Sequence, residues 1–226
     1  MGQKVNPLGF RIGIREPWRS RWTASKKDFP GLLVQDQRIR AFIKKEFRQA
    51  AVARIDIERT REATSVIIHT ARPGVLIGRK GVRAEQLRND LAALVGNNVT
   101  VHTVELGRPE LSAQLVAESV AEQLEKRVSF RRALKKTAQL TMQAGALGVK
   151  IHVAGRLGGA EMSRREAIIQ GSIKLATLDA NIDYGFAIAQ TSYGTIGCKC
   201  WIFRGWYEGT QKETAHGRRN CHRNPC

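Results

Sequence analysis

The sequence predicts an α/β protein (an α+β arrangement) with two domains, a basic N-terminal arm and a disordered C-terminal tail. Apolar residues at helical spacing alternate along the chain with short runs of β-branched residues. Hydrophobic residues make up 42% of the 226 residues, which is enough to fill a core in each domain. We expect an arm, a first domain, a second domain and a tail over residues 1–30, 31–106, 107–206 and 207–226.

The arm is predicted from the composition of residues 1–30, where basic residues outnumber acidic ones and glycine and proline recur. Such a stretch buries little apolar surface alone, so we expect it to become ordered on a partner. Lys4 and Arg11 are candidate RNA contacts within it. Trp18 and Trp22 fit either stacking on bases or packing on the domain.

The first domain is predicted to begin with a helix over residues 35–50, because apolar side chains recur there at helical spacing. Two strands rich in β-branched residues follow over 52–57 and 65–70, with a turn around Glu62 between them.

The rest of this domain surrounds a glycine-rich loop. We expect a helix after the loop that ends at Gly96, since glycine commonly follows a helix C-terminus. One face of this helix carries Leu87, Leu91 and Leu94. A strand over residues 99–106 completes the order α-β-β-α-loop-α-β.

The second domain is also predicted to be α/β. Two helices are expected over residues 112–127 and 130–144, each with apolar residues on one face. A glycine-rich turn at 155–161 is expected to lead into a short helix. Strands are expected over residues 149–153, 182–189 and 196–203.

The charge of the chain indicates a polyanionic partner. Lys and Arg number 38 against 20 Asp and Glu, which gives a net charge of +18. Such an excess attracts nucleic acid, and its clustering argues against a merely solubilising charge. Because no apolar run is long enough to cross a bilayer and no signal core is present, we expect a cytoplasmic protein without membrane contact.

The segment Gly78-Arg79-Lys80-Gly81 joins two predicted helical segments. Glycine lacks a Cβ, so the backbone bends tightly and a sugar-phosphate chain can approach it. The next helix adds free N–H groups, and Arg79 and Lys80 add charge. Turns that bind no ligand also contain this pattern of two glycines. The order of the flanking elements, however, is that of a KH domain, which clamps single-stranded RNA. No P-loop or dinucleotide-binding pattern overlaps this segment.

A second basic cluster covers residues 126–136, which contain six basic side chains and no acid. On a helix Arg131 shares a face with Lys135, and Ser129 is a candidate N-cap. Cations near the start of a helix oppose its dipole, and like charges at i,i+4 repel. A helix that keeps both features either binds an anion or exposes a merely solvated basic face.

No constellation typical of an enzyme or metal site is present, so we expect no catalytic residue, metal or cofactor. Cys198 and Cys200 share one face of a predicted strand, where cysteine acts as a small apolar residue. A zinc site formed by Cys221, His222 and Cys226 is an alternative, although its spacing matches no standard finger.

Several motifs occur in a fixed order along the chain. They are residues 1–7 (MGQKVNP), 69–81 (HTARPGVLIGRKG), 127–133 (RVSFRRA), 155–161 (GRLGGAE), 193–197 (YGTIG) and 201–202 (WI). Together they resemble the family of the third small-subunit ribosomal protein, S-three, over about residues 1–206.

The resemblance implies a type II KH domain followed by a family-specific C-terminal α/β domain. It implies a place in the head of the small ribosomal subunit, at the mouth where mRNA enters, with small-subunit rRNA as the main ligand. Ribosomal proteins S-ten and S-fourteen would be tight neighbours, and S-four and S-five would lie across the mouth. A basic face with Arg131, Arg132 and Lys135 would line the mRNA path and help to open structured messages without nucleotide hydrolysis.

The predicted RNA-binding residues combine both clusters with basic residues of the motifs and the arm. They are Gly78, Arg79, Lys80, Gly81, Arg83, Arg127, Arg131, Arg132, Lys135, Lys136, Arg156, Arg164, Arg165, Lys4 and Arg11. Residues 167–181 depart from the family's wording, and Asp179 stands where a basic residue is usual, which argues against an RNA contact there. The tail 207–226 has no counterpart in the family.

Two other functions fit parts of the sequence. A free KH-type RNA regulator would act off the ribosome, although the long second domain and the basic arm argue against it. An enzyme acting on nucleic acid, such as a lyase for damaged DNA, would need a reactive amine or carboxylate in a pocket.

Overall fold

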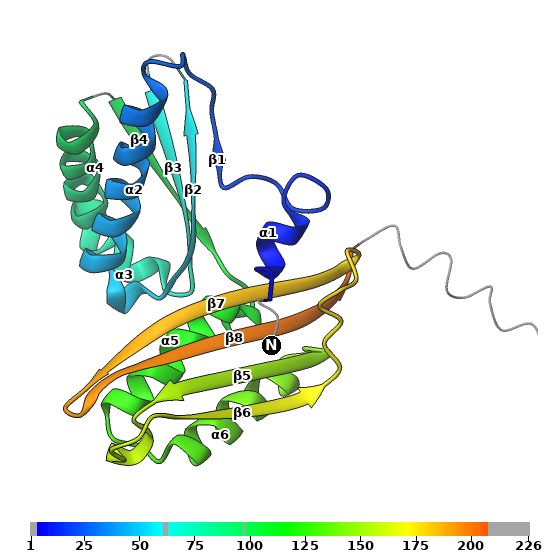
Figure 1. Cartoon of the computed structure of the whole chain (residues 1–226). Helices are drawn as coiled ribbons and strands as arrows, with labels where there is room; N and C mark the ends of the chain where they lie inside the picture. The colour runs from blue at the N-terminus through cyan, green and yellow to red at the C-terminus, as the bar shows by residue number, and fades with distance from the viewer. Residues whose placement is uncertain (1–3, 61–62, 97, 208–226) are drawn as a thin grey trace, which may run out of the picture. The chain divides into compact units, whose positions relative to one another are not determined.

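The computed structural model describes residues 4–60, 63–96 and 98–207 (Figure 1). The chain divides into two compact units. The first unit comprises Pro17–Val116, and the second comprises Met1–Glu16 together with Ala117–Cys226. The turn predicted at Glu62 and, apart from Tyr207, the tail predicted over 207–226 lie outside the described residues.

The first unit contains a four-stranded sheet with helices against one face (Figure 1). The strand order is β1-β2-β3-β4, in which β2 and β3 are antiparallel and the other neighbours are parallel. The predicted order α-β-β-α-loop-α-β is confirmed from α2 to β4. The elements are β1 (Ser20–Arg21), α2 (Phe29–Glu46), the 3₁₀ turn η1 (Arg48–Ala50), β2 (Val52–Arg59), β3 (Ala63–Thr70), α3 (Pro73–Ile77), η2 (Arg79–Gly81), α4 (Val82–Val95), β4 (Asn98–Glu105) and η3 (Pro109–Leu111).

Side-chain periodicity accounts for the core of the first unit. Along β3 every second residue is buried, so that Val66 and Ile68 reach the core. On α4 the buried stripe runs through Leu87 and Leu91 to Val95. Leu94, which was predicted to share this face, is 41% exposed. Val95, and not Leu94, continues the buried stripe, so Leu94 lies at its edge.

The helix predicted over residues 35–50 is wrong at both ends. Helix α2 begins at Phe29 because Pro30 lies in its first turn, where the missing N–H loses no helical hydrogen bond. The helix ends at Glu46 and is followed by η1, after which Ala51 adopts φ +54° before β2.

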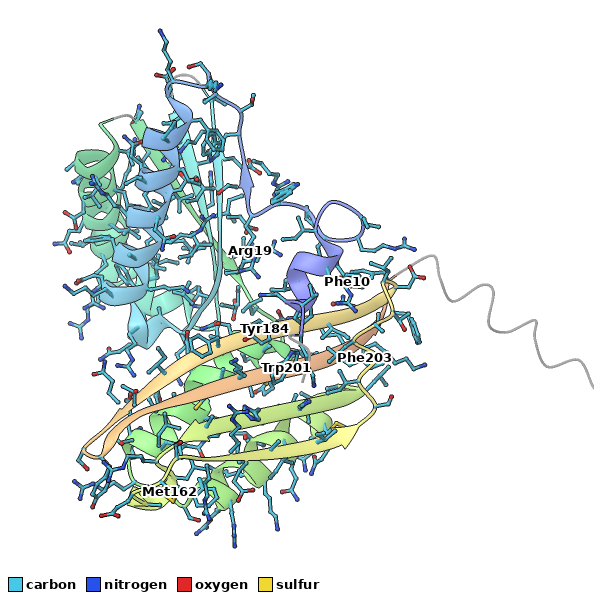
Figure 2. All side chains as sticks on the ribbon, viewed as in Figure 1. Phe10, Arg19, Met162, Tyr184, Trp201 and Phe203 are labelled. Atoms are coloured by element: carbon cyan, nitrogen blue, oxygen red, sulfur yellow. The ribbon has the colours of Figure 1, made fainter. Side chains whose placement is uncertain are left out.

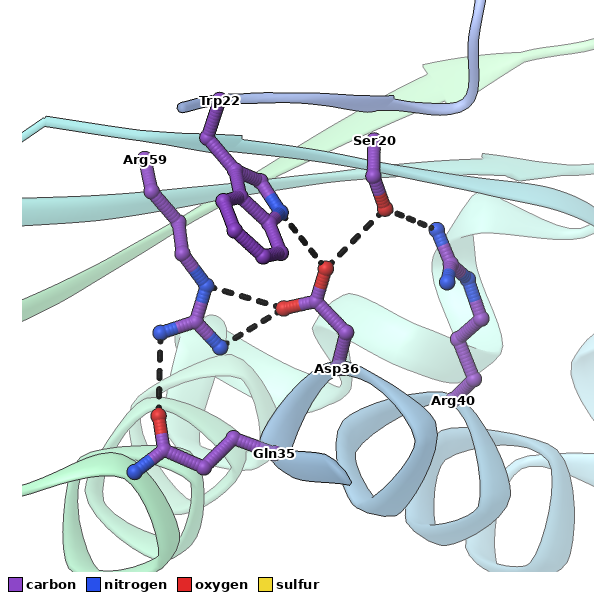
Figure 3. Close-up of polar contacts among 6 residues, drawn as sticks. All are labelled: Ser20, Trp22, Gln35, Asp36, Arg40 and Arg59. Atoms are coloured by element: carbon purple, nitrogen blue, oxygen red, sulfur yellow. Dashed lines mark hydrogen bonds and ion pairs between the residues drawn. The ribbon is translucent and has the colours of Figure 1, made fainter. Parts of the chain in front are cut away.

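Residues 17–30 of the predicted arm are ordered on the first unit itself. Strand β1 pairs in parallel with β2. The fully buried carboxylate of Asp36 on α2 accepts hydrogen bonds from Ser20 Oγ at 3.0 Å and Trp22 Nε1 at 2.8 Å (Figure 3). Arg59 of β2 donates from Nε to the same carboxylate at 2.8 Å. This part of the arm is therefore ordered by contacts within its own chain, whereas its composition had predicted ordering on a separate partner.

The second unit contains an antiparallel sheet in the order β6-β5-β8-β7, with α5 and α6 against one face (Figure 1). Helix α5 begins in the first unit and continues into the second. The elements are α1 (Pro7–Arg11), α5 (Ala113–Glu125), α6 (Phe130–Gln143), β5 (Gly148–Gly155), η4 (Leu157–Gly159), β6 (Arg164–Gly171), β7 (Ala180–Thr191) and β8 (Gly194–Trp206).

Strand β6 was not predicted. The short helix expected after residues 155–161 is only the 3₁₀ turn η4, and the chain then forms an edge strand. The strand begins with Arg164, Arg165 and Glu166, and its residues are exposed or half-buried. Edge strands commonly carry such charges, which hide the alternation that identifies a central strand.

Helix α1 and the segment 172–179 cover one end of the sheet face opposite α5 and α6. Ile182 and Phe203 are buried beneath this cover. Arg11 is fully buried, and its guanidinium donates to three backbone carbonyls. They belong to Pro7, Leu175 and Thr177, at 2.8, 3.2 and 2.6 Å. Arg11, predicted as an RNA contact, is thus engaged with the backbone of its own unit.

Candidate nucleic-acid interface

The glycine-rich loop joins α3 to α4 in the first unit. Gly78 has φ +72° and ψ −174°, a conformation that essentially only glycine adopts. A Cβ on Gly78 would also lie 2.9 Å from the Cβ of Arg83. Gly81, with φ +80°, directly precedes α4. The tight bend predicted from the two glycines is present.

Exposed charge and exposed apolar side chains occur together at this loop. Arg79 is exposed, and Arg83 folds back to donate to the carbonyl oxygen of Val75 at 3.3 Å. Ile77 and Val82, on either side of the loop, are 40% and 52% exposed. No side-chain oxygen caps the first turn of α4 in the described structure. Phosphate beside the N–H groups and bases beside the apolar residues would match this arrangement.

Helix α6 presents its basic residues to solvent because its other face is buried. Ala133, Leu134 and Ala138 lie on the buried face. The basic residues of the exposed face are Arg131, Arg132, Lys135 and Lys136. Ser129 occupies the predicted N-cap position, but its side chain makes no capping hydrogen bond. The first turn also holds no acidic residue, so nothing within it offsets the cations.

Phe130 brings two guanidinium groups together at the start of α6. The Cζ atom of Arg131 lies 5.7 Å from the centroid of its ring, and that of Arg164 on β6 lies 5.1 Å from it. Arg165 points to the opposite face of the sheet, because successive side chains of a strand alternate. Arg131 and Arg164 therefore form one cluster, whereas Arg165 belongs to another surface.

A pocket of about 320 Å³ opens beside Phe130, within the second unit. Its walls are the α5–α6 turn, η4 and the β7–β8 hairpin, and it is lined in part by Arg127 and Tyr193. Arg156 donates from Nε to Ala160 O at 3.0 Å and from Nη1 to Tyr193 O at 2.9 Å. Arg156, predicted as an RNA contact, thus also ties η4 to the hairpin.

Sequence reasoning missed Phe130 and Tyr193 as site residues. Both lie inside motifs that were singled out for their basic or glycine residues, so an aromatic within a basic motif was the available signal. The two tryptophans of the arm differ, since Trp22 packs on Phe29 with ring centroids 5.2 Å apart and Trp18 is 64% exposed.

Within residues 4–60, 63–96 and 98–207, no group of three or more His, Cys, Asp and Glu side chains could hold a metal ion. Cys198 and Cys200 are free and buried, and burial raises the pKa of the Cys198 thiol to about 11. The alternative zinc ligands Cys221, His222 and Cys226 lie outside the described residues. None of the described helices combines the length and the apolar character needed to cross a membrane.

Comparison with known proteins finds relatives over most of the chain. Residues 38–111 match the family model described as KH domain, and residues 120–202 match that of Ribosomal protein S3, C-terminal domain. Small ribosomal subunit protein uS3 of Rhodopirellula baltica is 53% identical over 212 residues, which cover 92% of this chain and 90% of that protein. The uS3 protein of Ruegeria pomeroyi is 54% identical over 205 residues, covering 91% and 87%. That of Desulforamulus reducens is 49% identical over 218 residues, covering 96% and 99%.

Proposed function

Because this chain belongs to the uS3 family of small ribosomal subunit proteins, we propose that it binds small-subunit rRNA in the head of the subunit and contacts mRNA where the message enters. It is an RNA-binding KH protein and a structural constituent of the small subunit. The glycine-rich loop of the first unit and the basic face of α6 in the second supply the two contacts.

The observation that carries the mRNA contact is the unneutralised basic face of α6. Its exposed cations are Arg131, Arg132, Lys135 and Lys136. In the described part of the chain, none of the four forms an ion pair with a carboxylate. Both the helix dipole and mutual repulsion make this arrangement unfavourable until anions arrive. Bound phosphates would remove both penalties and release counterions.

The glycine-rich loop supports the rRNA contact. A phosphate of an unpaired RNA segment can approach the backbone at Gly78, where no side chain fits. Arg79 can neutralise the next phosphate, and Ile77 and Val82 offer apolar surface to bases. Such a clamp holds the strand by its backbone, so it tolerates many base sequences.

The basic face of α6 can favour an open message without nucleotide hydrolysis. Leu134 and Ala138 fix the helix on the sheet, so the spacing of the cations is set before RNA binds. A surface that binds separated strands more tightly than a hairpin shifts the equilibrium toward the separated form. The shift is limited by the difference between the two affinities.

We further propose the neighbours that the family resemblance implies. S-ten and S-fourteen would be held tightly in the head, and S-four and S-five would face the chain across the mouth for mRNA. The protein would then be found in the cytoplasm as part of the ribosome.

Sucrose-gradient sedimentation of cell extract at moderate salt tests the proposed function. The chain should co-sediment with small subunits at one copy per subunit. Far fewer copies than subunits would favour a free RNA regulator, and recovery only in the soluble fraction would reject ribosomal membership.

A further inference from the structure

The sheet face opposite α5 and α6 carries cations and aromatic rings side by side. The register places Lys150 of β5 next to Trp201 of β8, and Trp201 next to Tyr184 of β7. One row further on, His152 of β5 lies next to Lys199 of β8. Residues paired in register on neighbouring strands point to the same side of the sheet, and so do residues two positions apart on one strand. All five side chains therefore lie on one face. We call these five residues the open face.

The aromatic rings of the open face lie in contact with each other and with a cation. Figure 2 shows Tyr184 and Trp201 together on the sheet, and their ring centroids are 5.4 Å apart. The Nζ atom of Lys150 lies 5.4 Å from the centroid of the Trp201 ring. Toward the sheet edges, Ile169 and Ile188 on the same side are 59% and 52% exposed. The cover formed by α1 and residues 172–179 is thus limited to the far end of this face.

The cations of this side repel one another. The pKa of Lys150 is lowered by burial and by the charge of Lys4. The pKa of His152 is also lowered by burial, and then by the charges of Lys199, Arg165, Lys150 and Lys4. The described strand residues that point to this side include no Asp or Glu. The second unit therefore concentrates positive charge here without a carboxylate on the sheet to offset it.

We propose that the open face binds a single-stranded segment of RNA, with phosphates at Lys150 and Lys199, an N–H of the His152 imidazole as a further hydrogen-bond donor, and a base against Tyr184 and Trp201. This rests on the proposed function and adds a contact to the glycine-rich loop and the basic face of α6. A four-stranded sheet with aromatic side chains on its free face is a recurrent platform for unpaired RNA. Stacking on such rings tolerates any base, because every base has a π-face.

Charge complementarity favours RNA over a protein as the occupant. Lys150 of β5 and Lys199 of β8 lie on this face on neighbouring strands, and Arg165 of β6 points to the same side. A protein partner would instead need carboxylates opposite Lys150 and Lys199.

The test compares two charge-matched pairs of substitutions in the full-length chain. Lys150→Gln with Lys199→Gln removes open-face charge, and Lys44→Gln with Lys45→Gln removes the same charge from exposed positions on α2. Affinity for a short single-stranded RNA labelled with 4-thiouridine is measured over a series of salt concentrations. Each phosphate contact adds about 0.7 to the slope of log affinity against log salt for single strands. The open-face pair should lower the slope by about 1.4 and the control pair should leave it unchanged.

Two further readouts separate the outcomes. Lys199→Gln alone, at an exposed position, should give about half of the change in slope without affecting folding. Irradiation should attach RNA to the tryptic peptide of residues 200–204, which contains Trp201.

Failure of the open-face proposal is distinguishable from failure of the proposed function. If the unmodified chain ignores RNA even in dilute salt, the proposed function itself fails. If it binds RNA but both pairs give equal slopes and no RNA reaches residues 200–204, only the open-face proposal is overturned. If the open-face pair weakens association with small subunits but leaves the affinity for RNA unchanged, this face binds a protein neighbour. That result would also overturn the open-face proposal.

Discussion

Arg59 and Asp36 form a buried ion pair in the first unit, with Arg59 Nε 2.8 Å from Asp36 Oδ1 (Figure 3). Their side chains are only 5% and 1% exposed. The same carboxylate accepts hydrogen bonds from Ser20 and Trp22, so one acidic residue joins the N-terminal segment to α2 and β2. The buried charge of Asp36 therefore helps to order residues 17–30, together with the pairing of β1 with β2.

Asp36→Asn should lower the free energy of unfolding by about 3 kcal/mol, because it leaves the guanidinium of Arg59 buried without its counter-charge. Asp90→Asn on α4 is the matched control, since Asp90 is exposed, and should change stability by about 0.5 kcal/mol or less. Urea denaturation followed by circular dichroism measures both. Equal small effects would show that the pair contributes nothing to the fold.

Gly78→Ala should destabilise the loop by about 1–3 kcal/mol and weaken RNA binding, because alanine resists φ +72° and its Cβ would meet Arg83. Gly74→Ala is the control, since Gly74 lies in α3 with no atom within 4 Å of an added Cβ. That change should be neutral or slightly stabilising. Thermal melts and RNA titrations of both variants decide the matter, and a Gly78→Ala chain with full stability and affinity would refute the geometric argument.

Arg131→Ala with Arg132→Ala should slow translation through hairpins while small subunits still assemble. Two exposed charge contacts of about 0.5–1 kcal/mol each correspond to a rate loss of roughly five- to thirtyfold. Lys44→Ala with Lys45→Ala removes equal charge from α2 and should leave the rate unchanged. The measurement is ribosome speed on messages with and without a stable hairpin. An equal loss of assembled subunits would give the arginines a structural role instead.

The stability of the second unit should depend on pH through His152. Its pKa lies below the usual 6.5, chiefly because of burial and then because Lys199, Arg165, Lys150 and Lys4 oppose its charge. The folded state therefore disfavours protonation, so this contribution to stability is complete above pH 6.5 and is lost as pH falls through the lowered pKa. His152→Gln should lose less stability than the unmodified chain between neutral and mildly acidic pH. Urea unfolding across that range would show parallel losses if His152 had no part in the effect.

The sequence predicted what periodicity and motif order can determine. A run of β-branched residues identified β3, helical spacing identified α6, and two glycines located the bend before α4. Edge strand β6 was missed because charged residues hide its pattern, and the start of α2 was missed because Pro30 resembles an interruption. Charged residues are compatible with a loop or an edge strand, and a proline is compatible with the end or the first turn of a helix. Only the surrounding structure decides between these alternatives.

The candidate site was less predictable, because side-chain partners depend on distant segments. In the sequence Arg11 cannot be distinguished from the other basic residues of the arm. In the structure it is buried and donates hydrogen bonds to backbone carbonyls just before β7. Arg15 pairs with Asp179, so this acidic side chain, which argued against an RNA contact, has a partner within the chain. The residues of the open face are brought together only by the register of β5, β8 and β7, which the sequence alone does not give.

RNA crosslinking of purified small subunits, with each crosslinked peptide identified by mass spectrometry, tests the central claim most directly. Fixed cations of this chain should hold RNA, so crosslinks should occur in the peptides that contain residues 78–81 and the start of α6 at 130–136. Subunits that contain the chain but yield no RNA on either segment would contradict the account.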